Sequence, residues 1–384
     1  MKVLVAQFDL QTPDDLWGLE SYDFADVLIR NGGIPIGRLT VRANNQSGIV
    51  TVEELQELLN RRYLTASSIV EPSTPSHRPG ISVVVCTRDR PLSLRRCLES
   101  LRKLHYDKME VLVIDNASRS SETKEIIAQT LFRYVREDHP GLDWARNRGL
   151  YEAIHEIVAY TDDDVQVDSA WLDGIAKGFQ HTNVACVTGL VCPLELEFPA
   201  QRLFEQYGGM GKGFEARLFA GSQMLPQQLI ATHSAGVGAN MAFRRDVLLR
   251  IGGFDVHLDV GTPANGGGDL DVFHRTLAAG YSIFYEPTAL VWHQHRRAMS
   301  ALHGQIYNNG RSLGCYLLKV AKQRTVARRA VADFALRNWI GKWLLASLVR
   351  GGPGRTPMLV VAELWGALHA PYAYWKTYLH QQKE

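Results

Sequence analysis

The fold is decided by the stretch Ile81-Ser82-Val83-Val84-Val85-Cys86-Thr87-Arg88-Asp89-Arg90-Pro91. Its first six residues are almost continuously apolar and β-branched, which is typical of a parallel strand buried on both faces of a sheet. Polar residues follow, and leucines at helical spacing then predict a helix over 92–104. This alternation continues along the chain and predicts an α/β fold, a Rossmann-like, mostly parallel sheet flanked by helices.

Outward from this stretch, strands are expected at 110–114, 132–136 and 157–160, with helices at 122–129 and 145–155. Ligands of open α/β sheets bind at the carboxyl ends of the strands. Three of these strand ends carry polar residues: Thr87, Arg88 and Asp89; Asp115 and Asn116; and Asp162, Asp163 and Asp164. Each group alone could be a solvated loop, but the three together predict one ligand site.

The triplet Asp162–Asp164 predicts a metal site. Adjacent carboxylates repel one another and raise each other's pKa unless a cation neutralises them. Oxygen ligands suit Mg²⁺ or Mn²⁺, and Mg²⁺ is usually shared with substrate phosphates. The alternative is an exposed acidic turn before a helix that starts near Asp168.

No phosphate-binding glycine motif of a known kind accompanies these strands. The sequence contains neither G-x-x-x-x-G-K-[ST] nor a G-x-G-x-x-G that opens a helix after a strand, which argues against a P-loop kinase and a nicotinamide dehydrogenase. A phosphate would then be held by a metal, by backbone N–H groups or by an arginine. Arg146 is the candidate, and its alternative is a surface position on a helix.

A second acidic group follows three glycines at 266–268. Asp269 would lie at the N-terminus of a helix over 272–279, where a carboxylate can act in a site or simply cap the helix. Asp271 is a second acid in the same turn. Further on, His293 and His295 alternate at the end of a strand, so one is expected to reach metal or phosphate and the other to lie on the surface.

Taken in order, these motifs resemble family 2 glycosyltransferases, enzymes of the GT-A fold that use nucleotide-sugar donors. The resemblance covers roughly residues 81–297. The motifs that carry it are Val83–Pro91, Val113–Ser118, Gly141–Gly149, Asp162–Asp164, Gly252–Asp255 and Gly267–Asp271.

The resemblance implies a role for each site residue. Residues assigned to the donor nucleotide are Thr87, Arg88, Asp89, Asp115, Asn116, Arg146, Asp162 and Asp163. Residues assigned to the metal, Mn²⁺ or Mg²⁺, are Asp164, Asp162 and His293. Asp269 would be the catalytic base of an inverting transfer, with Asn240, Gly268 and Asp271 near the sugar and acceptor.

Two positions depart from the family pattern. Asn116 stands where a second acid is usual, which leaves the nucleoside open. Gly268 stands where a glutamate usually precedes the base, which leaves the acceptor open.

The implied function is metal-dependent transfer of a sugar, from UDP in the first instance, to a hydroxyl of a bacterial glycan, a lipid-linked acceptor or a small molecule. One alternative is a nucleotidyltransferase, although Thr87–Pro91 lacks the glycines that this class needs. The other is a non-catalytic nucleotide-sugar-binding relative, which would have no use for a base at Asp269.

Four regions are predicted along the chain: an α+β accessory module at 1–64, a Pro/Ser-rich linker at 65–80, the glycosyltransferase domain at 81–298 and a basic helical region at 299–384. A capping box, Thr51 with Glu54, starts a helix in the first region. In the last, helices are expected at 307–322, 326–350 and 357–380.

The net charge of +2 conceals an uneven distribution. Residues 297–384 hold 13 Lys and Arg against 3 Asp and Glu, a net charge of +10, so the rest of the chain carries −8. A helix bearing Trp339, Trp343, Leu344 and Val349 with basic neighbours would either pack on the enzyme or lie at an anionic membrane surface. No module signature supports nucleic-acid binding.

The cysteine pattern and the chain start bear on localisation. The five cysteines are scattered and odd in number, as expected of reduced core thiols. No signal sequence and no spanning segment is recognised. We expect a cytoplasmic protein, placed at the inner face of the cell membrane if the basic region binds lipid.

Overall fold

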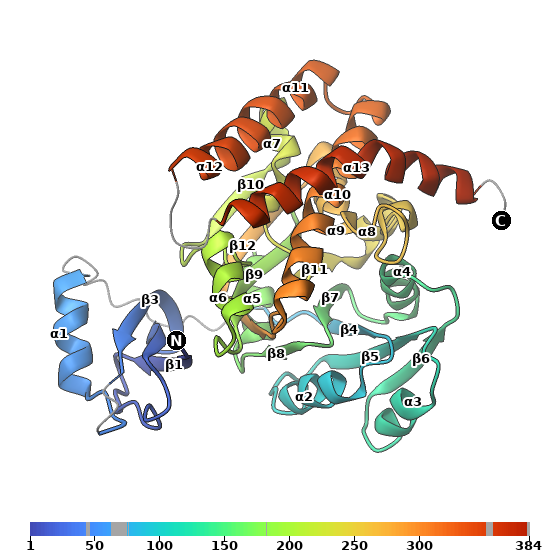
Figure 1. The fold of residues 1–384 in the computed structure, drawn as a ribbon. Helices are drawn as coiled ribbons and strands as arrows, with labels where there is room; N and C mark the ends of the chain where they lie inside the picture. Colours follow the sequence, from blue (N-terminus) through green and yellow to red (C-terminus); the bar gives the residue numbers. More distant parts are fainter. Residues whose placement is uncertain (44–46, 63–74, 76, 182, 351–355, 382–384) are drawn as a thin grey trace.

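The computed structural model describes residues 1–43, 47–62, 75, 77–181, 183–350 and 356–381. Along the chain come a small N-terminal sheet, a nine-stranded central sheet with helices on both faces, and a group of C-terminal helices (Figure 1). The region limits at 64, 80 and 298 stay predictions, and most of the predicted linker lies outside the described residues.

The N-terminal sheet consists of β1 (Val3–Asp9), β2 (Phe24–Asn31) and β3 (Ile34–Arg42), followed by α1 (Val52–Arg62). β1 and β2 are parallel, whereas β2 and β3 form a hairpin. The hairpin turns at Gly32 and Gly33, whose φ angles of 58° and 81° favour glycine. The capping box is confirmed, because Thr51 and Glu54 exchange hydrogen bonds of 3.0 and 3.3 Å.

The central sheet has the strand order β10-β12-β9-β11-β7-β4-β5-β6, and β8 pairs with β12 beside this path. Its strands are β4 (Ile81–Thr87), β5 (Met109–Asn116), β6 (Arg133–Glu137), β7 (Ile157–Asp162), β8 (Val165–Val167), β9 (Val184–Pro193), β10 (Arg217–Ala220), β11 (Asn240–Arg244) and β12 (Ser282–His293). The predicted α/β class is confirmed. The sheet is mixed rather than mostly parallel, because β11 runs antiparallel to both β7 and β9.

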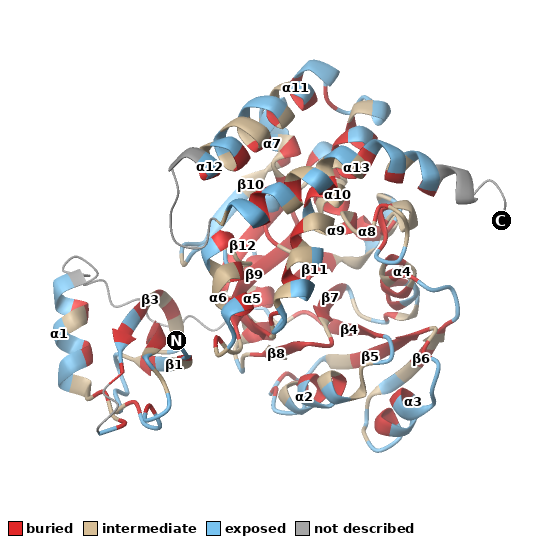
Figure 2. Ribbon diagram, viewed as in Figure 1, coloured by how far each residue is buried: buried red, intermediate tan, exposed pale blue. Residues whose placement is uncertain are grey.

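Helices cover both faces of this sheet. One face carries α2 (Pro91–Leu101), α3 (Glu122–Ile127) and α5 (Trp171–Gly178). The other carries α4 (Leu142–Glu152), α8 (Arg245–Arg250) and α9 (Gly268–Ala278). The strands are accordingly buried while the helices keep exposed outer faces (Figure 2).

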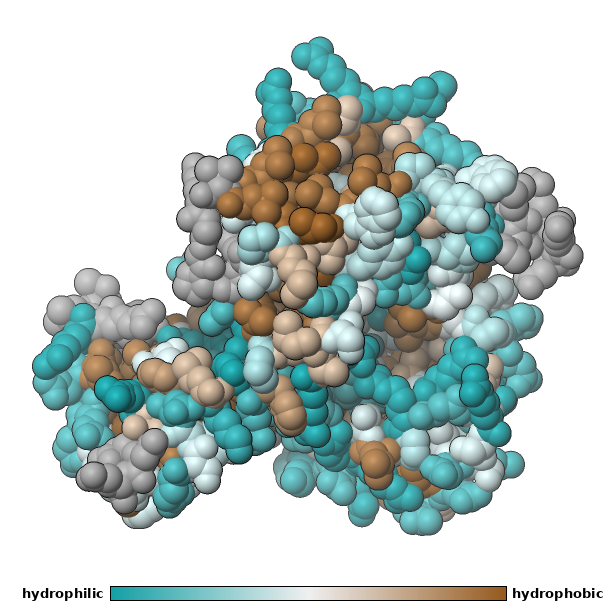
Figure 3. Space-filling view, in the orientation of Figure 1, coloured by the Kyte–Doolittle hydropathy of each residue, from teal (hydrophilic) through white to brown (hydrophobic). Residues whose placement is uncertain are grey.

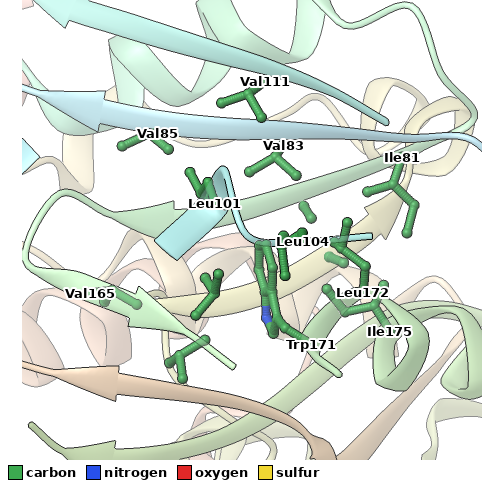
Figure 4. Close-up of a cluster of buried hydrophobic side chains, with 14 of the residues drawn as sticks. Ile81, Val83, Val85, Leu101, Leu104, Val111, Val165, Trp171, Leu172 and Ile175 are labelled. Atoms are coloured by element: carbon green, nitrogen blue, oxygen red, sulfur yellow. The ribbon is translucent and has the colours of Figure 1, made fainter. Parts of the chain in front are cut away.

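β4 lies within the sheet and contributes side chains to the two hydrophobic clusters that pack on its opposite faces. Val83 and Val85 pack with Trp171 on the first face (Figure 4), whereas Val84 and Cys86 belong to the second. All five cysteines are buried and free, as expected for core thiols.

Shorter elements connect the sheet to the C-terminal helices. They are α6 (Pro199–Tyr207), η1 (Gly221–Gln223), α7 (Pro226–Ile230), η2 (Thr232–Ser234) and η3 (Val256–Leu258). The C-terminal helices are α10 (Met299–Gln323), α11 (Arg328–Asp333), the π-helical η4 (Phe334–Leu345), α12 (Ala346–Arg350) and α13 (Pro357–Gln381). No helix in the described part of the chain combines the length and apolar character needed to cross a membrane.

The helices α10 and α13 pack tightly because glycines face the opposite backbone. A Cβ on Gly366 would lie 1.9 Å from the carbonyl oxygen of Tyr307, and one on Gly310 would lie 2.0 Å from that of Glu363. Since backbone cannot yield as a side chain can, any larger residue would force the helices apart.

We therefore predict that Gly366→Ala lowers the free energy of unfolding by about 1–3 kcal/mol through overpacking. The measurement is urea denaturation followed by circular dichroism. Gly304→Ala is the matched control, because it lies on exposed α10 surface with open space around its Cβ position. That control should be neutral or stabilising. Equal effects of the two substitutions would contradict the close-packing explanation.

Candidate active site

Pairing of the strands brings together the residues that follow them. β4 and β7 are parallel neighbours with Cys86 opposite Asp162, so Thr87 and the acidic triplet leave the sheet at the same edge. β8 pairs antiparallel with β12 and sets Val165 opposite His293. The turn that carries Asp164 is therefore held beside the end of β12.

Three side chains could hold a metal ion: Asp162, Asp164 and His293. One ligand atom from each lies within 4.8 Å of the others. The Nε2 atom of His293 is 3.3 Å from Oδ1 of Asp164. Burial lowers the pKa of His293 to about 4, so its ring is neutral and able to coordinate a cation. Two carboxylates and one imidazole could hold a divalent cation.

Asp163, between the two ligands, points to the protein rather than to the site. It accepts hydrogen bonds from Thr87 Oγ1 at 2.7 Å and from Arg90 at 2.5 Å. Burial raises its pKa to about 7. Arg90 also donates to Asp164 at 2.7 Å, so one guanidinium neutralises two of the three acids. The sequence analysis did not select Arg90, although it stands in the motif that follows β4.

Arg146 and Asp269 converge from α4 and α9. A Cβ built on Gly238 would lie 2.8 Å from Nη2 of Arg146 and 3.3 Å from Oδ2 of Asp269. Arg146 is buried, and its Nη2 lies 3.9 Å from Asp162. Asp269 is half-buried and accepts backbone hydrogen bonds from Gly238 at 3.0 Å and Leu270 at 2.9 Å. The carboxylate is thereby fixed beside the candidate metal ligands.

Asp143 occupies the space next to the glycine at 268. Its Oδ2 would lie 2.0 Å from a Cβ on Gly268, and this oxygen is buried without a hydrogen-bond partner among the described residues. Its other oxygen accepts from Arg146 at 3.1 Å. Burial raises the pKa of Asp143 well above its ordinary value. Gly268 thus leaves space for Asp143 rather than supplying a functional side chain. The sequence analysis did not select Asp143 as a site residue.

Asp115 and Asn116 end β5 in different environments. Oδ2 of Asp115 accepts from Tyr134 at 2.8 Å and from Arg136 at 3.1 Å, whereas its buried Oδ1 has no partner in the described part of the chain. The amide of Asn116 donates to the carbonyl of His139 at 2.7 Å and accepts from Gly141 at 2.8 Å. An acid could not make both bonds, which explains the departure at 116.

Four expected site residues lie elsewhere or are already engaged. Asn240 is buried and bonded to Trp171, Leu190 and Ala289 within the core. Asp271 is fully buried against Arg275 and Lys319, at 2.7 and 2.5 Å. These two assignments to the sugar or acceptor are corrected, because neither side chain has an open face. Arg88 and Asp89 are exposed, and Asp89 accepts from the backbone of Arg119 at 2.8 Å.

The expectation that His295 lies on the surface is wrong. Its ring is 4% exposed and contacts His293, with 3.0 Å between the two Nδ1 atoms. Strand alternation failed here because β12 ends at His293, so His295 belongs to the following loop.

A cavity of about 450 Å³ lies between the catalytic part and the C-terminal helices, lined by residues that include Tyr207, Lys212, His233, Trp339 and Trp343. Burial lowers the pKa of Lys212, and the Asp269 carboxylate partly offsets this shift.

Comparison with known proteins identifies the family. The sequence model of Glycosyl transferase family 2 matches residues 82–252. The pre-mycofactocin glycosyltransferase of Mycobacterium tuberculosis is 30% identical over 334 residues, which cover 86% of this chain and 64% of that protein. The glycosyltransferase AglE of Haloferax volcanii is 26% identical over 270 residues, 68% of this chain and 80% of that protein.

A solved structure, the mannosyltransferase PcManGT from Pyrobaculum calidifontis in complex with GDP-Man and Mn²⁺, aligns with a TM-score of 0.49 and 21% identity over 84% of this chain and 90% of that one. This chain spans 64% of the length of the mycobacterial relative. The family match includes β4, β5, β7 and α4, which carry most of the described site. Residues 82–252 of this chain belong to glycosyl transferase family 2.

Proposed function

We propose that this protein transfers a sugar from a nucleotide-sugar donor, in the first instance a UDP-sugar, to a hydroxyl acceptor with inversion at the anomeric carbon. The observation that carries the proposal is the convergence of two groups in one site. Asp162, Asp164 and His293 form a ligand set for a divalent cation, and Arg146, whose Nη2 lies 3.9 Å from Asp162, packs with Asp269 around Gly238. A transferase needs both, one for the leaving group and one for the nucleophile.

Two positive charges and one buried hydrogen-bond acceptor would bind the nucleotide-sugar donor. When bound, Mn²⁺ or Mg²⁺ would offset the negative charge of the departing nucleoside diphosphate. Arg146 adds a permanent positive charge, and because Arg146 is buried, its attraction for the diphosphate would be less weakened by water. Oδ1 of Asp115, which has no hydrogen-bond partner among the described residues, would accept an N–H of the base. Thr87 and Asn116 would act on the donor indirectly, because their side chains hydrogen-bond to neighbouring segments and hold these in position.

The acceptor side centres on Asp269. Two backbone N–H groups hold its carboxylate at the N-terminus of α9. Asp269 would accept the proton of the attacking hydroxyl. Attack from the face opposite the diphosphate inverts the anomeric centre. The cavity lined by Tyr207, Lys212, Trp339 and Trp343 is the proposed entry for the acceptor, whether lipid-linked, glycan or small molecule.

Donor breakdown separates this proposal from its rivals. We expect release of nucleoside diphosphate when the protein meets its nucleotide sugar, acceptor and Mn²⁺, and loss of release when EDTA is added. Chromatography of the products over a panel of nucleotide sugars is the measurement. Pyrophosphate release from nucleoside triphosphates would instead indicate a nucleotidyltransferase. Donor binding with no product under any acceptor would indicate a non-catalytic relative.

Replacement of the base gives a sharper test. We predict that Asp269→Asn slows transfer by about 10²–10⁴-fold, because the amide keeps the shape but cannot accept the proton. Donor affinity, followed by calorimetry, should stay near the wild-type value. Asp246→Asn, at an exposed position on α8, is the control and should transfer at the wild-type rate. An active Asp269→Asn protein would remove Asp269 from the mechanism.

The C-terminal helices bear on where the reaction takes place. Trp339 and Leu344 are buried, and the indole N–H groups of Trp339 and Trp343 donate to Glu363 at 2.8 and 3.3 Å. The alternative that this segment packs on the enzyme is therefore correct for these residues. A different apolar surface remains exposed on α13: Met358, Val361, Trp365, Leu368, Tyr372 and Trp375.

These six residues, the α13 stripe, recur every three or four positions and so share one helix face. Apolar side chains gather over α12 and α13 in Figure 3. The stripe belongs to the region of net charge +10, and its Trp and Tyr side chains suit a membrane interface. We propose that it docks on an anionic bilayer surface, at the cytoplasmic face, where a lipid-linked acceptor would be available.

We predict that Trp365→Ser with Leu368→Ser weakens binding to vesicles containing phosphatidylglycerol severalfold, since both side chains would leave water for the interface. Cosedimentation is the measurement. Leu92→Ser, which removes an equally exposed leucine from α2, should bind like wild type. If the stripe variants instead convert a dimer to a monomer without changing vesicle binding, the stripe is a self-association surface and the membrane proposal is wrong.

A further inference from the structure

A continuous run of polar contacts joins the N-terminal sheet to the candidate metal ligands. It passes through six side chains, here called the relay: Asp26, Arg38, Glu205, His295, His293 and Asp164. Asp26 and Arg38 belong to β2 and β3, outside the region that the family model matches. The other members come from α6, β12 with its following loop, and the acidic turn.

The contacts from Asp26 to His293 have hydrogen-bond geometry, whereas the last one is a close approach between two candidate metal ligands. Nη1 of Arg38 donates to Oε2 of Glu205 at 2.7 Å, and Oε1 of Glu205 lies 2.9 Å from Nε2 of His295. The Nδ1 atoms of His295 and His293 are 3.0 Å apart. Nε2 of His293 then faces Asp164 at 3.3 Å.

Counting donors and acceptors gives the relay a direction. An ionised carboxylate only accepts, so the proton between Glu205 and His295 belongs to Nε2 of His295. Coordination of a cation by Nε2 of His293 places the ring proton of His293 on Nδ1, which then donates to Nδ1 of His295. This tautomer leaves a lone pair on Nε2 of His293, the atom that faces Asp164 and that a cation requires.

Burial prevents water from replacing these contacts. The side chains of His295 and His293 are 2% and 9% exposed, and that of Glu205 is 15% exposed. The ring of Phe204 packs edge-on against His295 with 4.8 Å between centroids. Without Arg38, Glu205 would lose its charged partner, and nothing else in the described part of the chain forms an ion pair with Glu205 except His295.

We propose that Glu205 and Arg38 are positioning residues for the metal ligand His293, so that the N-terminal sheet sets the affinity of the active site for a divalent cation. The inference rests on the metal site of the proposed function. It gives the N-terminal region a task that its sequence did not suggest. Partners that orient a ligating histidine typically change metal affinity by about 10–100-fold when they are removed.

The test measures Mn²⁺ affinity of the full-length protein by electron paramagnetic resonance, without donor or acceptor. We expect Glu205→Gln and Arg38→Gln each to weaken Mn²⁺ binding by about 10–100-fold. A glutamine at 205 can donate as well as accept, so it no longer selects one tautomer of His295. Asp164→Asn serves as the reference for loss of a ligand.

Arg30→Gln is the matched control. Arg30 also joins the N-terminal sheet to the catalytic part, through an ion pair with Asp168, and among the described residues its side-chain hydrogen bonds go to Gly33 and Asp168 rather than to the relay. Its variant should bind Mn²⁺ like wild type. If Arg30→Gln weakens Mn²⁺ binding as much as Arg38→Gln does, general docking rather than the relay sets the affinity, and the proposal is overturned.

Nitrogen-15 NMR of the histidines, with Mg²⁺ or without metal, supplies a second readout. The metal-loaded wild type should hold His295 as the Nε2–H tautomer, and Glu205→Gln should show a mixture. If Asp164→Asn loses Mn²⁺ while both relay variants keep wild-type affinity and tautomer, the relay proposal alone is wrong. If wild type and Asp164→Asn bind Mn²⁺ equally, the metal site of the proposed function fails and the relay proposal fails with it.

Discussion

The arrangement of the candidate active site depends on the repulsion among carboxylates that lie together at one edge of the central sheet. Asp143, Asp162, Asp163 and Asp164 come from two adjoining elements and lie largely out of water. Like charges at such distances cannot all ionise without compensation. Arg90 bridges Asp163 and Asp164, and Arg146 faces Asp143 and Asp162. Two buried or half-buried guanidiniums thus hold the acids in place and leave a remaining demand for positive charge that a cation and a donor would meet.

The departure from the family pattern at 268 follows from the same constraint. A side chain there would collide with Asp143, so the glycine and the buried acid from α4 occur as a pair. Asp259 extends this arrangement by accepting from the backbone N–H of Trp144 at 3.3 Å, at the start of α4. Burial raises the pKa of Asp259 to about 6. Asp143 therefore fills the space that a side chain at 268 would need, and it faces Arg146.

Features that depend on local sequence pattern, such as buried strands and long helices, could be predicted from the sequence. β4, β5, β7 and the long C-terminal helices followed from apolar runs and periodicity, and the strand ends located most of the acids. β9 and β11 were missed, although β9 is an apolar run of the same kind as β4. Asn240 and Asp271 were misplaced because a motif fixes the position of a residue but not the direction of its side chain. Arg38, Glu205 and His295 could not be linked from sequence, since their contacts span 90 residues or more.

The uneven charge of the chain also has an internal explanation. Lys319 on α10 is 7% exposed and lies 2.5 Å from both Asp255 and Asp271, so part of the positive charge of the C-terminal region neutralises acids of the catalytic part. A protein shortened before α10 would leave Asp271 buried without this partner, at a substantial cost in stability. Removal of the whole region would therefore mix loss of folding with loss of any surface function. Substitutions confined to the exposed α13 stripe leave Lys319 and its partners intact, which makes them the cleaner test of what the basic region does at a surface.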